Sequence, residues 1–447
     1  MGSGVPGGVG AGVVWEVGEV YGAETLNATY LQLLTDGLEL RVIGYRRGPV
    51  HVPDGFFTAT VSVAAGVVAA AGVAVCLRGA RRELDDRTAP MAGLVAAFVF
   101  AVQMLNFPVA AGTTGHLLGG TLAAVLVGPY TAVLCVAVVL LVQGFFFADG
   151  GLTALGVNIT LMAIVTAAVG WAVFRLILRA APRRTVVPVA AFVGAAVSVP
   201  TAALVFTGLF WIGGTAPIDV GAVAAAMGGV HVLIGLGEGL ITALTVSSVL
   251  AVRPDLVYGA RGLTAPLVLR TAGGPVKVAP TGSSQLTLSG SPQAAAVTDS
   301  PQITVSGSPQ AATTGSSQAV PAGSSRAVPT GSPQAGSTGN APARGLRPIL
   351  VGGALVALLL AGFVSFYASS SPDGLEKVAG DKGLNAQERD HPLGDSPLAD
   401  YGVRGVGNER LAVGLAGVAG VAITVVAGGA IFMTVRRRGR AAERAGV

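Results

Sequence analysis

The clearest pattern in the chain is a series of long apolar runs separated by short polar or basic stretches. A helix needs about 20 apolar residues to cross a bilayer. Runs near this length predict seven spans in the first part of the chain, at 58–77, 91–108, 117–128, 130–148, 152–174, 186–212 and 220–250. Two more, at 348–368 and 411–433, predict a transmembrane hairpin. We therefore predict an all-α membrane protein with a bundle of about seven helices and a C-terminal two-helix hairpin.

The third predicted span is short, and Gly128-Pro129 separates it from the fourth. The pair 117–128 and 130–148 is thus either a helical hairpin or a partly re-entrant element packed inside protein. Irregular backbone is tolerated at membrane depth only where protein or a water-filled cavity surrounds it.

The stretch between the two apolar regions is rich in Gly, Ser, Pro, Thr and Gln, and repeats units such as Gly-Ser-Pro-Gln. Such a segment lacks the apolar surface needed for a packed core, which is typical of a disordered linker. The predicted organisation is therefore 1–49, a membrane module at 50–253, a linker at 254–347 and a second membrane module at 348–447.

Composition agrees with this class, because 52% of the residues are hydrophobic and only 11% are charged, with a mean hydropathy of +0.68. The net charge of +5 does not indicate nucleic-acid binding, since the basic residues lie in short clusters next to apolar runs. The clusters fall on one side of the predicted membrane: Arg78, Arg81, Arg82, Arg87, Arg175, Arg179, Arg183, Arg184, Arg253, Arg344 and Arg347.

By the positive-inside rule that side is cytoplasmic. We therefore expect a multi-pass protein of the bacterial plasma membrane with His51 and the loop 372–410 outside. The linker and the C-terminus are expected in the cytoplasm. Cys76 and Cys135 both lie inside apolar runs without metal-site spacing, so they are expected to be small buried side chains.

Several polar residues lie near or within the predicted spans and must face protein or a cavity. Three of them are candidates to hydrogen-bond and orient the ligands of a metal site: Gln103, Asn106 and Asn158. Hydrogen bonding between helices is the more common role of such residues. His231 and Glu238 share one face of the seventh span, where packing or partner contact is favoured over metal binding.

Two histidines lie at the edges of predicted spans, in the segments His51-Val52-Pro53-Asp54-Gly55-Phe56 and Gly115-His116-Leu117-Leu118-Gly119-Gly120. Taken alone, His116 is equally a metal ligand or a satisfied buried histidine. His51 before Pro-Asp-Gly is ordinarily a solvated turn residue. Asp54 is ordinarily a turn former, with a hydrogen bond that orients an imidazole as the alternative.

These segments, together with FADGGLTALGVNITLMAIV, resemble the cobalt/nickel permeases of the CbiM/NikM family over residues 51–250. The segment SSSPDGLEKVAGDKG resembles the PDGLE-type small component of the same systems, similar to NikN and CbiN. The resemblance implies a metal permease fused to its accessory component.

In that family a terminal amine, the amide and imidazole nitrogens of the next histidine, and a second histidine bind the metal. The resemblance therefore implies Val50, His51 and His116 as ligands, a nitrogen set that suits Ni²⁺ or Co²⁺. Because Val50 follows 49 other residues, a free amine there requires that residues 1–49 are an over-extended gene start, with Val50 encoded by a GTG start codon, or are removed.

The polar loop of the second module carries Asp373, Glu376, Asp381, Glu388, Asp390 and His391. These residues either collect metal at the outer face or form a solvated loop, and docking against the first module is the favoured role.

No phosphate-binding loop and no hydrolase motif occurs in the sequence, so we predict that the chain is not an enzyme. The resemblance implies an ATP-driven importer of Co²⁺ or Ni²⁺ whose transmembrane coupling subunit and cytoplasmic ATPases are separate partners. The metal is then a substrate, and no cofactor is expected. Two alternatives remain, an ATP-independent channel or carrier and a membrane metal-sensing or assembly protein. The choice between cobalt and nickel stays open.

Overall fold

The computed structural model describes residues 51–110, 113–263, 346–367 and 371–444, together with four short strands. The strands β1 (Leu31–Gln32) and β2 (Arg41–Val42) pair antiparallel, as do β5 (Leu267–Thr271) and β6 (Gly274–Val278). Val50, the rest of the segment 1–49 and the rest of the linker lie outside the described residues. The described part of the first module continues past the predicted boundary at 253 to Leu263. It includes the short helices η4 (Pro254–Leu256) and η5 (Tyr258–Ala260), and Val257 between them and Ala260 in η5 are fully buried.

The prediction of an all-α membrane protein is confirmed. Within the described residues, seven helical segments are long and apolar enough to cross a membrane. Those of the first module are α1 (Ala59–Glu83), α4 (Pro129–Phe146), the segment Leu155–Ala180, α7 (Val187–Gly213), which follows the turn η3 (Arg184–Val186), and α8 (Val220–Val252). Those of the second module are α9 (Arg347–Gly362), which continues into η6 (Val364–Tyr367), and α11 (Glu409–Arg444).

Two predicted spans of the first module are shorter than the sequence pattern indicated. The second is α2 (Thr88–Gln103), and the third is α3 (Gly120–Val127), which has only eight residues. Between them lies an antiparallel hairpin of β3 (Phe107–Ala110) and β4 (Thr113–Gly115), which the apolar pattern did not distinguish from helix. The third candidate is therefore a short helix behind an irregular loop, packed against α4.

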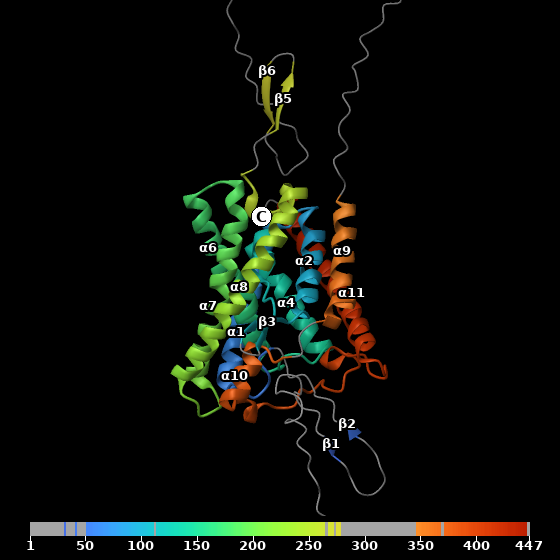
Figure 1. Ribbon diagram of the computed structural model, residues 1–447. Helices are drawn as coiled ribbons and strands as arrows, with labels where there is room; N and C mark the ends of the chain where they lie inside the picture. Colours follow the sequence, from blue (N-terminus) through green and yellow to red (C-terminus); the bar gives the residue numbers. More distant parts are fainter. Residues whose placement is uncertain are drawn as a thin grey trace, which may run out of the picture. The chain divides into compact units, whose positions relative to one another are not determined.

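Helices α2, α3 and α4 lie inside the bundle, and the other helices surround them (Figure 1). Of the apolar window of α4, 72% is buried within the protein, compared with 22% for both α1 and α8. The outer helices thus present apolar side chains to lipid, as Leu176, Leu204, Trp211 and Leu240 do. This explains why a sequence rich in apolar residues on all helix faces gives no single buried stripe.

The segment Leu155–Ala180 is one continuous span with a change of helical geometry inside it. It begins as α5 (Leu155–Asn158), continues as the π-helical segment η2 (Ile159–Val165) and ends as α6 (Thr166–Ala180). A π-helical turn is rare and frequently marks a functional position. Here it directly follows Asn158.

The helices of the second module pack against helices of the first module. Helix α11 lies against α2, and Gly93 of α2 faces Gly429 of α11, where an added Cβ on Gly93 would lie 3.4 Å from the backbone nitrogen of Gly429. Small residues at such contacts let helices approach closely in lipid. At one end of this contact Arg436 forms an ion pair with Asp86 at 3.0 Å.

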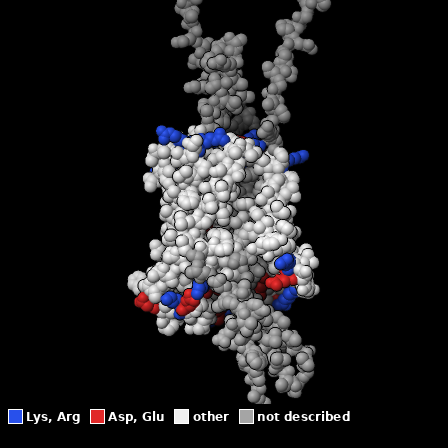
Figure 2. Space-filling view, viewed as in Figure 1, with Lys and Arg blue, Asp and Glu red and all other residues white. Residues whose placement is uncertain are grey.

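The polar loop of the second module contains α10 (Gly374–Lys382), η7 (Leu384–Gln387) and η8 (Ala399–Tyr401). It lies at one end of the helices, as the orange α10 shows in Figure 1. Figure 2 shows Lys and Arg side chains at both ends, and at the end that carries the loop they lie among acidic side chains.

Candidate functional site

His51 and His116, far apart in the sequence, lie face to edge inside the protein. Their ring centroids are 5.4 Å apart with an interplanar angle of 82°. The residues are 2% and 8% exposed, so neither is the solvated turn residue that an isolated reading of His51 suggests. The structure therefore brings together two of the three predicted ligands, while Val50 lies outside the described residues.

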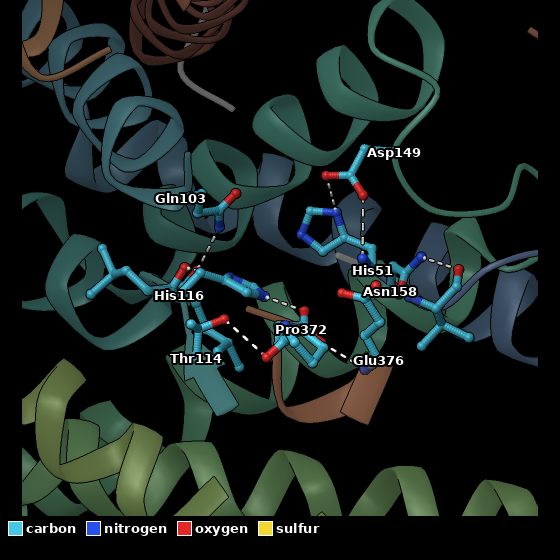
Figure 3. Close-up of polar contacts among 12 residues, drawn as sticks. His51, Gln103, Thr114, His116, Asp149, Asn158, Pro372 and Glu376 are labelled. Carbon is cyan, nitrogen blue, oxygen red and sulfur yellow. Dashed lines mark hydrogen bonds and ion pairs between the residues drawn. The ribbon is translucent and has the colours of Figure 1, made fainter. Parts of the chain in front are cut away.

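The loop Asp149-Gly150-Gly151 and Asn158 hold His51 in place (Figure 3). Nδ1 of His51 lies 2.9 Å from a carboxylate oxygen of Asp149, and the His51 backbone N–H donates to the other oxygen at 3.2 Å. The Asn158 amide accepts from the Val52 N–H and donates to the Val52 carbonyl, each at 3.1 Å. Gly150 is required by this approach, because a Cβ there would lie 2.7 Å from Cβ of His51.

Asp149 is in turn held by the second module. The Tyr401 hydroxyl donates to the Asp149 carboxylate at 2.7 Å. Ala148, Asp400 and Tyr401 are the non-glycine residues with positive φ in the described part of the chain, and all three adjoin this contact. Backbone in this region is strained, and such strain persists where surrounding structure fixes it.

The loop that carries His116 runs from β4 to α3 and is fixed by buried side chains. Glu238 of α8 accepts hydrogen bonds from the Leu118 N–H at 2.7 Å and the Gly119 N–H at 3.1 Å. Gln103 donates to the Leu118 carbonyl at 3.1 Å. Gly119 has a φ of 84°, a conformation that favours glycine. Glu238 and Gln103 therefore position the predicted ligand.

Asp54 binds the chain just after the loop Asp149-Gly150-Gly151, rather than orienting an imidazole. Its carboxylate accepts from the backbone N–H groups of Leu152 at 3.1 Å and Thr153 at 2.7 Å, and so holds the end of the loop that carries Asp149. Its own carbonyl accepts from the Arg389 N–H of the second module at 2.9 Å. Asn106, the fourth polar candidate, has a buried amide oxygen without a hydrogen-bond partner.

A residue of the PDGLE segment reaches this site. Asp373 is 2% exposed, and one of its carboxylate oxygens lies 3.8 Å from Nε2 of His116. Thr114, two residues before His116, binds the neighbouring segment: its N–H donates to the Pro372 carbonyl at 2.9 Å, and its hydroxyl to the Ser371 carbonyl at 3.0 Å. The favoured role of the loop, docking against the first module, is what the structure shows.

A cavity of about 70 Å³ lies between these elements. His51, His116, Asn158, His231 and Asp373 contribute to its lining, with apolar side chains such as Met162, Phe206 and Ile234. Nε2 of His51 is buried without a hydrogen-bond partner. His231 turns its Nδ1 to the Met227 carbonyl at 2.7 Å, in keeping with the favoured packing role. The volume suffices for an ion and a few waters.

The pKa values of the two histidines are shifted in opposite directions. Burial lowers the pKa of His116 to about 4, so its imidazole is neutral near pH 7. Burial alone also lowers the pKa of His51, but the Asp149 carboxylate beside it reverses this and the net pKa is raised. Burial favours the neutral form of Asp149, yet His51 holds its pKa down at about 2.

Side chains alone do not form a closed metal cage. Within the described residues no group of three or more His, Cys, Asp and Glu side chains is gathered around one point. The imidazoles of His51, His116 and His231 and the carboxylate of Asp373 line the cavity instead. His391 is not among them, because its Nδ1 accepts from the Leu393 N–H in its own turn.

Sequence reasoning missed the roles of Asp149 and Tyr401, and it gave Glu238 a packing role. Asp149 lies in a segment that carries the family resemblance, and that resemblance is the signal that could have identified it. Tyr401 has no comparable signal, since only the packing of the two modules places its hydroxyl at Asp149.

Comparison with known families agrees with this architecture. Residues 51–256 match the family model described as the CbiM cobalt uptake substrate-specific transmembrane region, and residues 347–437 match the PDGLE domain. The chain belongs to the CbiM family. Its CbiM part is fused to a PDGLE domain, the arrangement of the fused NikMN proteins.

Three relatives illustrate the range of this family. A Haloquadratum walsbyi protein named for metal transport is 35% identical over 209 residues, 47% of this chain and 94% of the relative. The fused nickel transport protein NikMN of Rhodobacter capsulatus is 36% identical over 233 residues, 48% of this chain and 66% of the relative. The cobalt transport protein CbiM of Sorangium cellulosum is 38% identical over 188 residues, covering 41% and 83%. This CbiM-family protein is thus a multi-pass membrane component of metal transport.

Asn158→Ala tests how the His51 backbone is held in this CbiM-family protein. The change removes both hydrogen bonds to Val52 and leaves its buried N–H and carbonyl without these partners. We expect metal affinity to fall by about 10- to 100-fold with normal membrane insertion, as measured by calorimetric titration with Ni²⁺. Asn106→Ala is the matched control, since its buried oxygen has no partner, and it should keep full affinity. An equal effect of both variants would contradict this role for Asn158.

Proposed function

We propose that this chain is the substrate-specific component of an ATP-driven importer for Co²⁺ or Ni²⁺, which binds the ion between His51 and His116. One observation carries the proposal: two buried imidazoles converge at 5.4 Å beside a small cavity, and one of their nitrogens has no partner there. A buried polar atom without a partner is costly, and an ion that binds it removes this cost. Imidazole nitrogens suit both metals.

His51 offers two ways of binding an ion. Nε2 is unpartnered, so it is available without rearrangement. The backbone nitrogen and Nδ1, which together close a small chelate ring, both face Asp149. An ion bound to them lies where the carboxylate now accepts the backbone hydrogen bond and pairs with the imidazole. The family resemblance favours this second mode, with a free amine at residue 50 completing the chelate.

The histidine variants test the proposed site directly. His51→Ala and His116→Ala should each lower Ni²⁺ and Co²⁺ affinity by at least about 100-fold, more than is typical for a residue that only supports a ligand. Both proteins should still insert and purify as the native chain does, because helix packing does not depend on the imidazoles. His391→Ala, outside the cavity, is the control and should bind normally. Retained binding in His116→Ala would refute the site.

Two forms of the chain test the chelate. One starts at Met1, and the other starts with Met in place of Val50. We expect tight Ni²⁺ binding only by the shorter form, because an internal amide is a poor ligand and a terminal amine is a good one. Mass spectrometry of the N-terminus confirms which form is titrated. Equal affinity of both intact forms would instead support ligation through Nε2 of His51.

ATP-driven transport requires partner subunits, since this chain carries no phosphate-binding loop. We propose a transmembrane coupling subunit and cytoplasmic ATPases as these partners, with the ion captured at the outer face. Uptake of radioactive Ni²⁺ or Co²⁺ by cells that express the chain should fall to background when the coupling subunit or the ATPases are deleted. Accumulation that survives the deletion would support a stand-alone channel or carrier.

A further inference from the structure

Asp373 lies in the PDGLE segment, far in sequence from either histidine, yet it lines the same cavity. Two features of the segment place it there. Thr114 donates a hydrogen bond to the carbonyl of Pro372, the residue before Asp373. The hairpin that leads into His116 and the segment that leads into Asp373 therefore run side by side. Gly374 permits the close approach to α8, because a Cβ there would lie 2.8 Å from Cγ1 of Val230 and 2.9 Å from Cδ1 of Ile234.

The two carboxylate oxygens of Asp373 have different surroundings. Oδ1 accepts from the Glu376 N–H at 2.7 Å and caps the N-terminus of α10. Oδ2 points toward the imidazole of His116 and lies 3.8 Å from Nε2. A helix cap uses only one oxygen, so capping does not explain why the second oxygen is buried against a histidine.

The distance of 3.8 Å distinguishes two kinds of contact. It is too long for a hydrogen bond. It is close to the separation of two ligands on one ion, since bonds of about 2.0–2.2 Å to nitrogen and oxygen add to about 4.2 Å when they lie opposite each other, and to less when bent. The gap lies between the separations of adjacent and of opposite ligands, so a small shift of either side chain lets both reach one ion.

We infer that Asp373 of the PDGLE domain is a ligand of the transported metal ion, which it shares with His116. The accessory domain then supplies part of the binding site, in addition to docking on the permease part. This inference rests on the proposed function, because it requires that His116 binds the ion.

The experiment titrates the purified chain, in the form that starts with Met in place of Val50, with Ni²⁺ and, separately, with Co²⁺, whose visible absorption bands report on its ligands. Asp373→Asn and Asp373→Ser both keep a side chain that caps α10, and size-exclusion chromatography checks that each remains folded. Asp381→Asn is the control, since Asp381 lies on the same helix and pairs with Lys377 at its exposed face. We expect both Asp373 variants to bind about 10- to 100-fold more weakly with shifted Co²⁺ bands, and Asp381→Asn to match the native chain.

Unchanged affinity and unchanged bands in Asp373→Asn would overturn the assignment. Weaker binding with native bands would also overturn it, because the carboxylate would then support the site without touching the ion. His116→Ala separates this inference from the proposed function. If His116→Ala loses binding while Asp373→Asn is native, only the Asp373 assignment fails. If His116→Ala binds normally, the proposed site fails and the Asp373 assignment fails with it.

Discussion

The structure depends on satisfying backbone groups that lie inside the bundle without regular secondary structure. The buried loop before α3 has backbone N–H groups that form no helical hydrogen bonds, and the carboxylate of Glu238 accepts hydrogen bonds from two of them. Asn158 does the same for both backbone groups of Val52. Because these bonds hold the residues next to His116 and His51, the requirement to satisfy the backbone also fixes the two imidazoles.

The PDGLE domain contributes to the same region from the other module. Tyr401 binds Asp149 beside His51, and the segment before Asp373 binds Thr114 beside His116. A residue that binds or adjoins each histidine is therefore held by the second module. Fusion in one chain keeps the concentration of that module near the site high, whereas separate chains would have to associate first.

The sequence predicted the fold class and most spans, because long apolar runs have few alternatives to membrane helices. It did not identify the β3–β4 hairpin, since Phe107 and Pro108 continue the apolar run of the second predicted span, and it began the third span at Leu117, three residues before α3. Motif resemblance pointed to His51 and His116. It did not assign roles to Tyr401 or Glu238, whose functions arise from contacts between distant segments. Such contacts leave no local pattern in a single sequence.

A divalent ion that leaves water for this cavity loses its hydration, so opposite charge must compensate it there. In the proposed site the two imidazoles bind the ion in their neutral form, so they do not offset its charge. Asp149 lies beside His51 and, with a pKa of about 2, is ionised. Asp373 is the second carboxylate, and burial raises its pKa to about 7, so an ion next to it favours the charged form. With both carboxylates ionised, their two negative charges balance the dication. In the proposed site the CbiM part supplies one of these charges and the PDGLE domain the other, so the inference gives the PDGLE domain a direct electrostatic part in holding the metal.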